Sequence, residues 1–275
     1  MGNLLQEAAL RGDTDTVRIL LQNDVSEENE AGALQKAVIH GHREIISLLL
    51  VHDAEKESRC CNGTALQGSG NTESVNPEHV AQVSGNAERR NCYGASLYQA
   101  SWTGNEAIIM LLIQHGADMN ADGGEYGSAA GAAAAAGHDL VLKLLIKHGA
   151  GINAKAGCYG SALQAASQEG HEAVVKLLLE LGADINADGG EYGSAAGAAA
   201  VAGHDSVLKL LIEHRADINA KAGRYGSALQ AASQEGHEAI VKLLLELGGD
   251  INAGGGHYGS ALQAAARTWT STTRT

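Results

Sequence analysis

The arrangement of apolar and polar positions over residues 159–187 predicts two short helices separated by a tight turn. Ser161 is a favourable N-cap, and the helix formers that follow it run up to Gly170, which can end a helix at no steric cost. Over residues 172–181, valines and leucines form a broad apolar stripe at helical spacing, and Gly182 follows as a stop. The turn-forming residues beyond Gly182 predict a finger, meaning the turn or extended segment that leads to the next unit.

The same unit returns along the chain with a constant period of 33 residues, marked by a Tyr-Gly pair. The pair stands at residues 93, 126, 159, 192, 225 and 258. Such a period is typical of stacked supersecondary units, because one unit alone would leave its Leu/Val face in water. The units alternate in type, and their near-identity at an offset of 66 residues suggests duplication of a two-repeat block. We call the first helix of each unit the inner helix and the second the outer helix.

The unit resembles the ankyrin repeat in three stretches. These are Gly170-His171, Val175-Lys176-Leu177-Leu178-Leu179 and Gly182-Ala183-Asp184-Ile185-Asn186-Ala187. The family's Thr-Pro-Leu-His opening is replaced by Ser161-Ala162-Leu163-Gln164, in a variant similar to that of fungal ankyrin arrays. The resemblance implies an all-α, ankyrin-like α-solenoid of helix-turn-helix repeats with short β-turn fingers.

The repeat pattern divides the chain into four segments. We expect N-terminal capping repeats over residues 1–61, a degenerate repeat with an irregular loop over 62–92, five regular repeats over 93–257, and a partial repeat with a polar tail over 258–275. The degenerate repeat is either a decayed copy or a loop that folds over a partner or ligand.

Local signals predict helices in these less regular segments as well. The predicted helices cover residues 5–12, 17–21, 44–51 and about 77–83, with an irregular stretch over 68–75 and a last inner helix ending near Ala266. Trp269 in the tail either covers the exposed end of the stack or is loose.

The composition of the chain indicates which classes of partner and which cellular compartment to expect. A net charge of −13 argues against nucleic-acid binding and favours a basic or neutral protein partner. The four cysteines, at residues 60, 61, 92 and 158, lack metal-ligand spacing, so we expect a reduced cytoplasmic or otherwise intracellular setting. We expect no leader, membrane span, cofactor or metal, because no corresponding motif or apolar run is present.

The resemblance implies a concave groove lined by the fingers and by the exposed side of the inner helices, where variable positions contact the partner. On this chain these are two finger positions ahead of each Tyr and the two residues before each Gly-His. The finger positions are Arg89, Cys92, Asp122, Glu125, Lys155, Cys158, Asp188, Glu191, Lys221, Arg224 and His257. The inner-helix positions are Trp102, Thr103, Gln168, Glu169, Val201, Ala202, Gln234 and Glu235.

Several of these positions have two interpretations. Trp102 stands where other copies carry Gln, Ala or Val, so it either anchors a partner or packs on the irregular third repeat. Arg224 and His257 replace Cys or Glu, so they either contact an acidic group or are solvated surface charges. The histidine that recurs after the turn glycine, as in Gly170-His171, is expected to have the same structural role in every copy.

The inner helices that open at Ser128 and Ser194 carry Ala and Gly where other copies carry Leu and Gln. Loss of these side chains predicts closer helix packing, or Tyr126 and Tyr192 swinging in to fill the space, or else a small-molecule pocket rimmed by tyrosines.

Two functions follow. The first is a non-catalytic scaffold that binds a protein through the concave groove. The alternative is a small-molecule-binding protein or an enzyme in the same groove. It would use Glu125, Glu191 or His257 as acid or base near Tyr126, Tyr192 and Tyr225.

Overall fold

The computed structural model describes residues 2–23, 25–64, 93–155, 157–220, 223–257 and 259–272, without the side chains of residues 2–3, 57–64 and 267–272. The chain forms two compact units, Met1–Asp118 and Met119–Thr275. No helix in the described part of the chain has the length and apolar character needed to cross a membrane.

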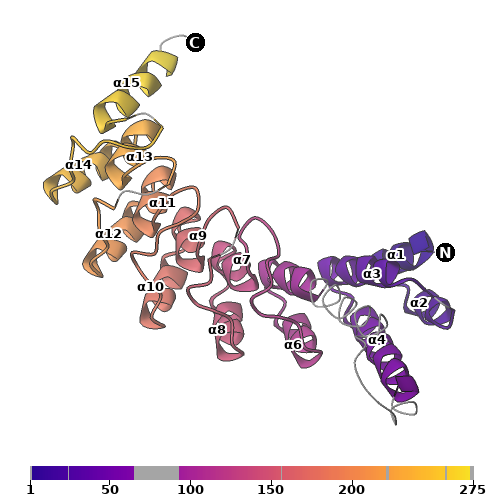
Figure 1. Cartoon of the computed structure of the whole chain (residues 1–275). Helices are drawn as coiled ribbons and strands as arrows, with labels where there is room; N and C mark the ends of the chain where they lie inside the picture. The colour runs from indigo at the N-terminus through magenta and orange to yellow at the C-terminus, as the bar shows by residue number, and fades with distance from the viewer. Residues whose placement is uncertain are drawn as a thin grey trace, which may run out of the picture. The chain divides into compact units, whose positions relative to one another are not determined.

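The unit Met119–Thr275 consists of two rows of helices (Figure 1). The inner row is α7 (Ala129–Ala135), α9 (Ala162–Gln168), α11 (Ala195–Ala202), α13 (Ala228–Glu235) and α15 (Ala261–Thr272), each in contact with the next. The outer row is α8 (Asp139–Lys147), α10 (Glu172–Glu180), α12 (Asp205–Glu213) and α14 (Glu238–Glu246), each packed on its own inner helix. The predicted all-α solenoid of helix-turn-helix repeats is therefore confirmed.

The fingers are turns closed by single backbone bridges. Isolated antiparallel bridges join Gly189 to Gly193 and Gly255 to Gly259. No strand longer than such a bridge occurs in the described residues. The fingers thus add a hydrogen-bonded edge to the helical rows.

The core lies between successive repeats. Residues Ala162 to Ser167 of α9 are buried, because this inner helix has α7 and α11 on its two sides and the outer helix α10 behind it. The outer helix α10 buries Val174, Val175 and Leu178, as its apolar stripe predicts. Leu181, which the prediction places in that stripe, lies beyond the end of α10 and is exposed.

The alternation of repeat types has a hydrogen-bonding cause. In the Leu/Gln repeats, Ser161 and Gln164 form a capping box, with the Ser161 N–H donating to Gln164 Oε1 at 2.7 Å. The same glutamine amide donates to the following finger, at 3.1 Å to the Gly189 carbonyl. Gln230 forms the equivalent box with Ser227.

In the Ala/Gly repeats a backbone carbonyl replaces that glutamine. The Ser128 N–H donates to the Tyr126 carbonyl oxygen at 3.0 Å, and a Cβ at Gly131 would lie 2.1 Å from this oxygen. Gly197 has the same relation to Tyr192, with a Cβ 2.4 Å from its carbonyl oxygen. The N–H of the cap serine therefore donates to a glutamine side chain in one type of repeat and to a tyrosine carbonyl in the other. This difference accounts for Gln in one set of repeats and Gly in the other.

The unit Met1–Asp118 follows the same plan with longer helices. It contains α1 (Gly2–Arg11), α2 (Thr14–Leu21), α3 (Glu27–His40), α4 (Arg43–Thr64), a helix over residues 93–102 and α6 (Glu106–Gln114). The predicted helices over residues 5–12 and 17–21 correspond to α1 and α2.

Two predicted helix ends are wrong. Helix α4 does not end at Val51 but runs to Thr64, and α15 does not end near Ala266 but runs to Thr272. In both cases the glycine that follows most of the other helices is missing at the expected position, and helix-compatible residues continue. The predictions for residues 68–75 and 77–83 and for Trp269 lie outside the described residues or side chains.

Arg215 is the one non-glycine residue with a positive φ, 69°, in the described part of the chain. It occupies the position after an outer helix where Gly182 has a φ of 88°. An L-residue in this left-handed conformation is strained by about 1 kcal/mol relative to glycine.

We expect Arg215→Gly to stabilise the chain by about 0.5–1 kcal/mol, because it relieves this strain. The reverse change at the equivalent site, Gly182→Ala, should destabilise it by about 1 kcal/mol. No atom lies within 4 Å of a Cβ placed there, so the backbone conformation alone decides the effect. Urea unfolding followed by circular dichroism measures both; destabilisation by Arg215→Gly would contradict the strain.

Candidate functional site

One residue from each finger forms a continuous backbone ladder along the unit Met119–Thr275. Four hydrogen bonds join five residues, each N–H donating to the carbonyl of the preceding finger: Cys158 N–H to Glu125 O (2.9 Å), Glu191 N–H to Cys158 O (2.8 Å), Arg224 N–H to Glu191 O (2.8 Å) and His257 N–H to Arg224 O (2.9 Å). All five side chains are exposed. We call these five residues the fingertip row. They are the second of the two predicted finger positions in each repeat.

Four tyrosines, each next in sequence to a residue of the fingertip row, bring their rings into contact, with two of the three ring pairs stacked and one tilted. The tyrosine ladder is Tyr126, Tyr159, Tyr192 and Tyr225, with successive ring centroids 4.6, 5.6 and 5.8 Å apart. The rings are half-buried. Burial and the nearby Glu169 carboxylate raise the pKa of Tyr126 to about 12. Burial and the neighbouring phenol also raise the pKa values of Tyr159 and Tyr192.

Two carboxylates accept hydrogen bonds from the first two phenols of the ladder. The Tyr126 hydroxyl donates to Glu169 Oε1 at 3.3 Å, and the Tyr159 hydroxyl donates to Glu125 Oε1 at 3.4 Å. Both glutamates are exposed. The ladder thus joins a predicted finger position to a predicted inner-helix position.

Two pairs of predicted partner-binding residues bind each other instead of standing apart. Lys155 Nζ lies 2.7 Å from Asp188 Oδ1, and Arg224 Nη1 lies 2.9 Å from Glu191 Oε1. Each pair links adjacent fingers at an offset of 33 residues. Because all four side chains are exposed to solvent, these pairs add little stability.

The remaining predicted positions are partly accessible. Asp122 and Glu235 are exposed, whereas Gln168, Gln234, Val201 and Ala202 are half-buried. Trp102, in the unit Met1–Asp118, has 39% of its surface exposed at the end of its helix, next to exposed Thr103. Arg89, Cys92 and Lys221 lie outside the described residues. Nothing here tests the assignment of these positions to partner binding, which stays a prediction.

The recurrent histidines join repeats, in keeping with their expected structural role. The ring nitrogen Nε2 of His171 lies 2.8 Å from the carbonyl oxygen of Ala135, and that of His237 lies 2.9 Å from Val201 O. A second set of inter-repeat bonds comes from asparagines of the fingers, which sequence reasoning missed. The backbone N–H groups of Asp184, Asp217 and Asp250 donate to Asn153, Asn186 and Asn219 Oδ1, each at 2.8 Å.

The Ala/Gly repeats leave no room for a pocket at their glycines. The backbone of Tyr126 and Tyr192 fills the position of the missing glutamine side chains, as the geometry at Gly131 and Gly197 shows. Closer packing is therefore the alternative that the structure favours for these positions.

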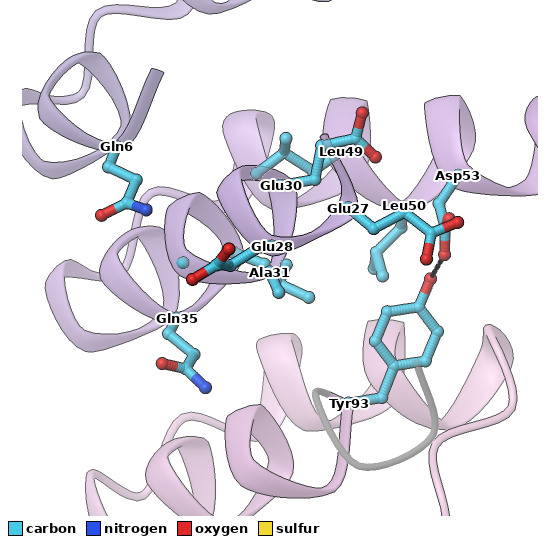
Figure 2. Close-up of a pocket in the computed structure, with 12 residues that line it drawn as sticks. Gln6, Glu27, Glu28, Glu30, Ala31, Gln35, Leu49, Leu50, Asp53 and Tyr93 are labelled. Atoms are coloured by element: carbon cyan, nitrogen blue, oxygen red, sulfur yellow. Dashed lines mark hydrogen bonds between the residues drawn. The ribbon is translucent and has the colours of Figure 1, made fainter. Parts of the chain in front are cut away.

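A pocket of about 470 Å³ lies in the unit Met1–Asp118 (Figure 2). Its lining combines carboxylates and amides with an apolar wall: Gln6, Glu27, Glu28, Glu30, Ala31, Gly32, Leu34, Gln35, Leu49, Leu50, Asp53 and Tyr93. The Tyr93 hydroxyl donates to Asp53 Oδ2 at the edge of this pocket. Sequence reasoning missed the pocket, since its residues come from α1, α3, α4 and the helix over residues 93–102.

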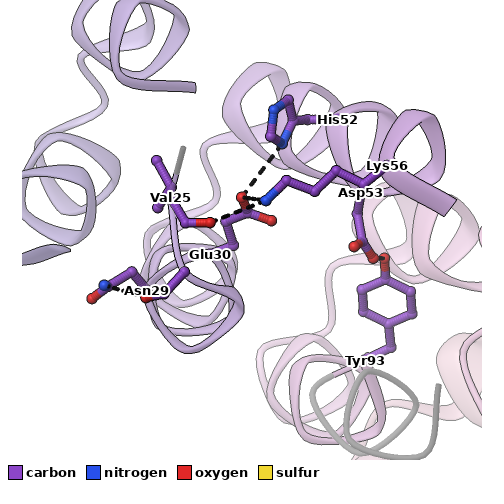
Figure 3. A network of polar contacts seen from close by, with 8 residues as sticks. Val25, Asn29, Glu30, His52, Asp53, Lys56 and Tyr93 are labelled. Carbon is purple, nitrogen blue, oxygen red and sulfur yellow. Dashed lines mark hydrogen bonds and ion pairs between the residues drawn. The ribbon is translucent and has the colours of Figure 1, made fainter. Parts of the chain in front are cut away.

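A polar network stabilises the same unit (Figure 3). Glu30 is only 8% exposed, and its carboxylate accepts a hydrogen bond from Lys56 and lies 3.5 Å from His52 Nδ1. Lys56 also donates to the Val25 carbonyl at 3.1 Å. The network therefore ties α3 and the segment before it to α4.

Comparison with known families identifies the repeats. The model of a family described as ankyrin repeats (3 copies) matches residues 5–123, 97–189 and 190–268. Comparison with curated proteins finds no match.

The tyrosine ladder should make stability depend on pH at alkaline values. The folded state holds the Tyr126 proton up to about pH 12, whereas the ordinary value is 10.0, so this contribution is complete below pH 10 and is lost as pH rises from 10 toward 12. We expect Tyr126→Phe to flatten the decline of unfolding free energy in this window. Urea unfolding at a series of pH values measures the slope, and an unchanged slope in the variant would disprove the assignment.

Glu30→Gln should destabilise the unit Met1–Asp118 by about 1–3 kcal/mol, because it leaves Lys56 without its charged partner in a half-buried position. Glu28→Gln is the matched control on the same helix: Glu28 is exposed, so the change should stay within about 0.5 kcal/mol. Thermal unfolding of both variants measures the difference; equal effects would rule out a stabilising network.

Proposed function

Because the chain belongs to the ankyrin repeat family, we propose that it is a non-catalytic scaffold that binds a partner protein through the concave groove. Ankyrin repeats are generally protein–protein interaction modules. The groove comprises the fingertip row, the tyrosine ladder and the exposed ends of the inner helices.

The backbone ladder of the fingertip row is the observation that carries this proposal. Its hydrogen bonds of 2.8–2.9 Å hold five exposed side chains at one register. These side chains differ in chemistry, since they are Glu, Cys, Glu, Arg and His, although the backbone around them repeats. A rigid backbone that presents different side chains favours binding, because little conformational entropy is lost when a partner docks.

Charge and cysteine chemistry suggest the kind of partner and the compartment. A net charge of −13 favours a basic or neutral protein surface over nucleic acid. Cys158 is an exposed free thiol, which supports a reducing, intracellular compartment.

The alternative function, acid–base chemistry or small-molecule binding in the groove, has less support. A raised pKa for Tyr126, Tyr159 and Tyr192 moves these phenols away from the neutral range that a general acid or base needs. Glu191 pairs with Arg224, and the Ala/Gly positions leave no pocket at Gly131 and Gly197.

A charge reversal on the two faces tests the proposal. Glu169→Lys with Glu235→Lys alters two equivalent exposed positions at the ends of α9 and α13, on the groove side. Glu180→Lys with Glu246→Lys makes the same charge change at the ends of the outer helices α10 and α14. We expect proteins captured from extracts of the source cells to bind the outer-face variant as they bind the wild type. The groove variant should retain about tenfold less of them.

Quantitative mass spectrometry of the captured proteins gives the result, and circular dichroism confirms that both variants are folded. If the two variants lose the same proteins, or neither loses any, the groove is not the binding surface.

A further inference from the structure

The two copies of the duplicated two-repeat block can be compared residue by residue. Around the tyrosine ladder the two copies carry equivalent residues at an offset of 66: Glu125 and Glu191, Tyr126 and Tyr192, Tyr159 and Tyr225, Glu169 and Glu235. The finger residues 155–159 and 221–225 are identical except at one position, where the first copy has Cys158 and the second has Arg224. The two copies therefore carry the same carboxylates and phenols. Only the second copy has an arginine beside them.

In the second copy the chain's own arginine occupies the fingertip carboxylate. Arg224 Nη1 donates to Glu191 Oε1 at 2.9 Å. Both side chains are exposed, 63% and 40% respectively, so the pair forms at the surface of the groove and not in the core. This copy shows that the geometry around the carboxylate accepts a guanidinium group.

In the first copy no cation of the described residues pairs with the equivalent carboxylate, Glu125. Among the described residues no Lys, Arg or His forms a salt bridge with Glu125 or Glu169, and Cys158 supplies only a small thiol. The two carboxylates accept hydrogen bonds from Tyr159 and Tyr126, whose rings stack with centroids 4.6 Å apart. Two carboxylates thus lie at the hydroxyl ends of one pair of stacked phenol rings.

We infer that Glu125, Tyr126, Tyr159 and Glu169 bind an arginine side chain of the partner protein. The guanidinium would pair with Glu125 as Arg224 pairs with Glu191, beside the Tyr159 hydroxyl that donates to the same carboxylate. Arginine suits this site better than lysine, because its planar fork of N–H donors can bond both oxygens of one carboxylate. The inference rests on the proposed function, and it adds the chemistry of one contact: the side chain that the partner contributes.

Exchanging the residue that differs between the copies tests the inference on the full chain. Cys158→Arg should fill the first site from within, and Arg224→Cys should open the second. Cys158→Ser controls for loss of the thiol, and Glu180→Gln on α10 changes the net charge by the same amount as Cys158→Arg, away from the groove. The probes are three capped heptapeptides with a Gly/Ser background and a central arginine, citrulline or lysine. Citrulline has nearly the shape of arginine but no charge.

Ring signals of ¹³C-labelled tyrosines report the binding. We expect the arginine peptide to shift the signals of Tyr126 and Tyr159 in the wild type, the serine variant and the Glu180→Gln variant. Cys158→Arg should abolish these shifts, and Arg224→Cys should add shifts at Tyr192 and Tyr225. The lysine peptide should bind about fivefold more weakly, and the citrulline peptide should give no shifts. Equal shifts with citrulline, or unchanged binding to Cys158→Arg, would overturn the inference.

The capture experiment separates this inference from the proposed function. If Cys158→Arg retains every protein that the groove variant loses, the groove binds partners but not through an arginine at this site. If no captured protein depends on the groove, the proposed function itself fails, whatever the peptides do.

Discussion

Burial between neighbours is the constraint on which the structure depends. An inner helix such as α9 has most of its residues buried, because the inner helices α7 and α11 and its own outer helix α10 enclose it. Alanine dominates the buried positions of the inner helices, and each repeat relies on the next for its core. The 33-residue register follows, since a shift of one repeat against another would separate the buried faces.

Hydrogen bonds between repeats then fix the register that burial favours. The fingertip backbone ladder runs along one edge, and the bonds of the finger asparagines and the recurrent histidines join the repeats elsewhere. All of them connect residues about one period apart. Because they involve the backbone at one end at least, the fingers are held rigidly while their side chains differ. This separation of a fixed backbone from variable side chains is what suits the surface to recognition.

The fold was largely predictable, whereas the site was predictable only as a set of positions. Helix boundaries in the regular repeats follow from serine caps and glycine stops, and they were wrong where the glycine is missing, as at α4 and α15. The finger positions were identified in advance, but the pairing of Lys155 with Asp188 and of Arg224 with Glu191 was not. Each of these pairs joins neighbouring fingers, and the local sequence does not predict which side chains of two neighbouring fingers come into contact. The pocket beside Tyr93 escaped notice for the same reason, because four separate helices supply its walls.

The sequence by itself determined the period, the two helices of each repeat and their apolar faces, since these depend on contacts within a few residues and on a spacing that recurs. Only the tertiary structure decided which groups meet across the period of 33 residues. It showed that a tyrosine carbonyl takes the place of a glutamine amide at Gly131 and that four phenol rings are in contact along the repeats. It also showed that Arg224 pairs with Glu191, whereas the counterpart carboxylate, Glu125, has no cation in the described residues. The physical reason is that the stacking of repeats places equivalent residues side by side. The partner of a side chain therefore lies in the neighbouring repeat, and the order of residues along the chain does not say which residue of that repeat it is.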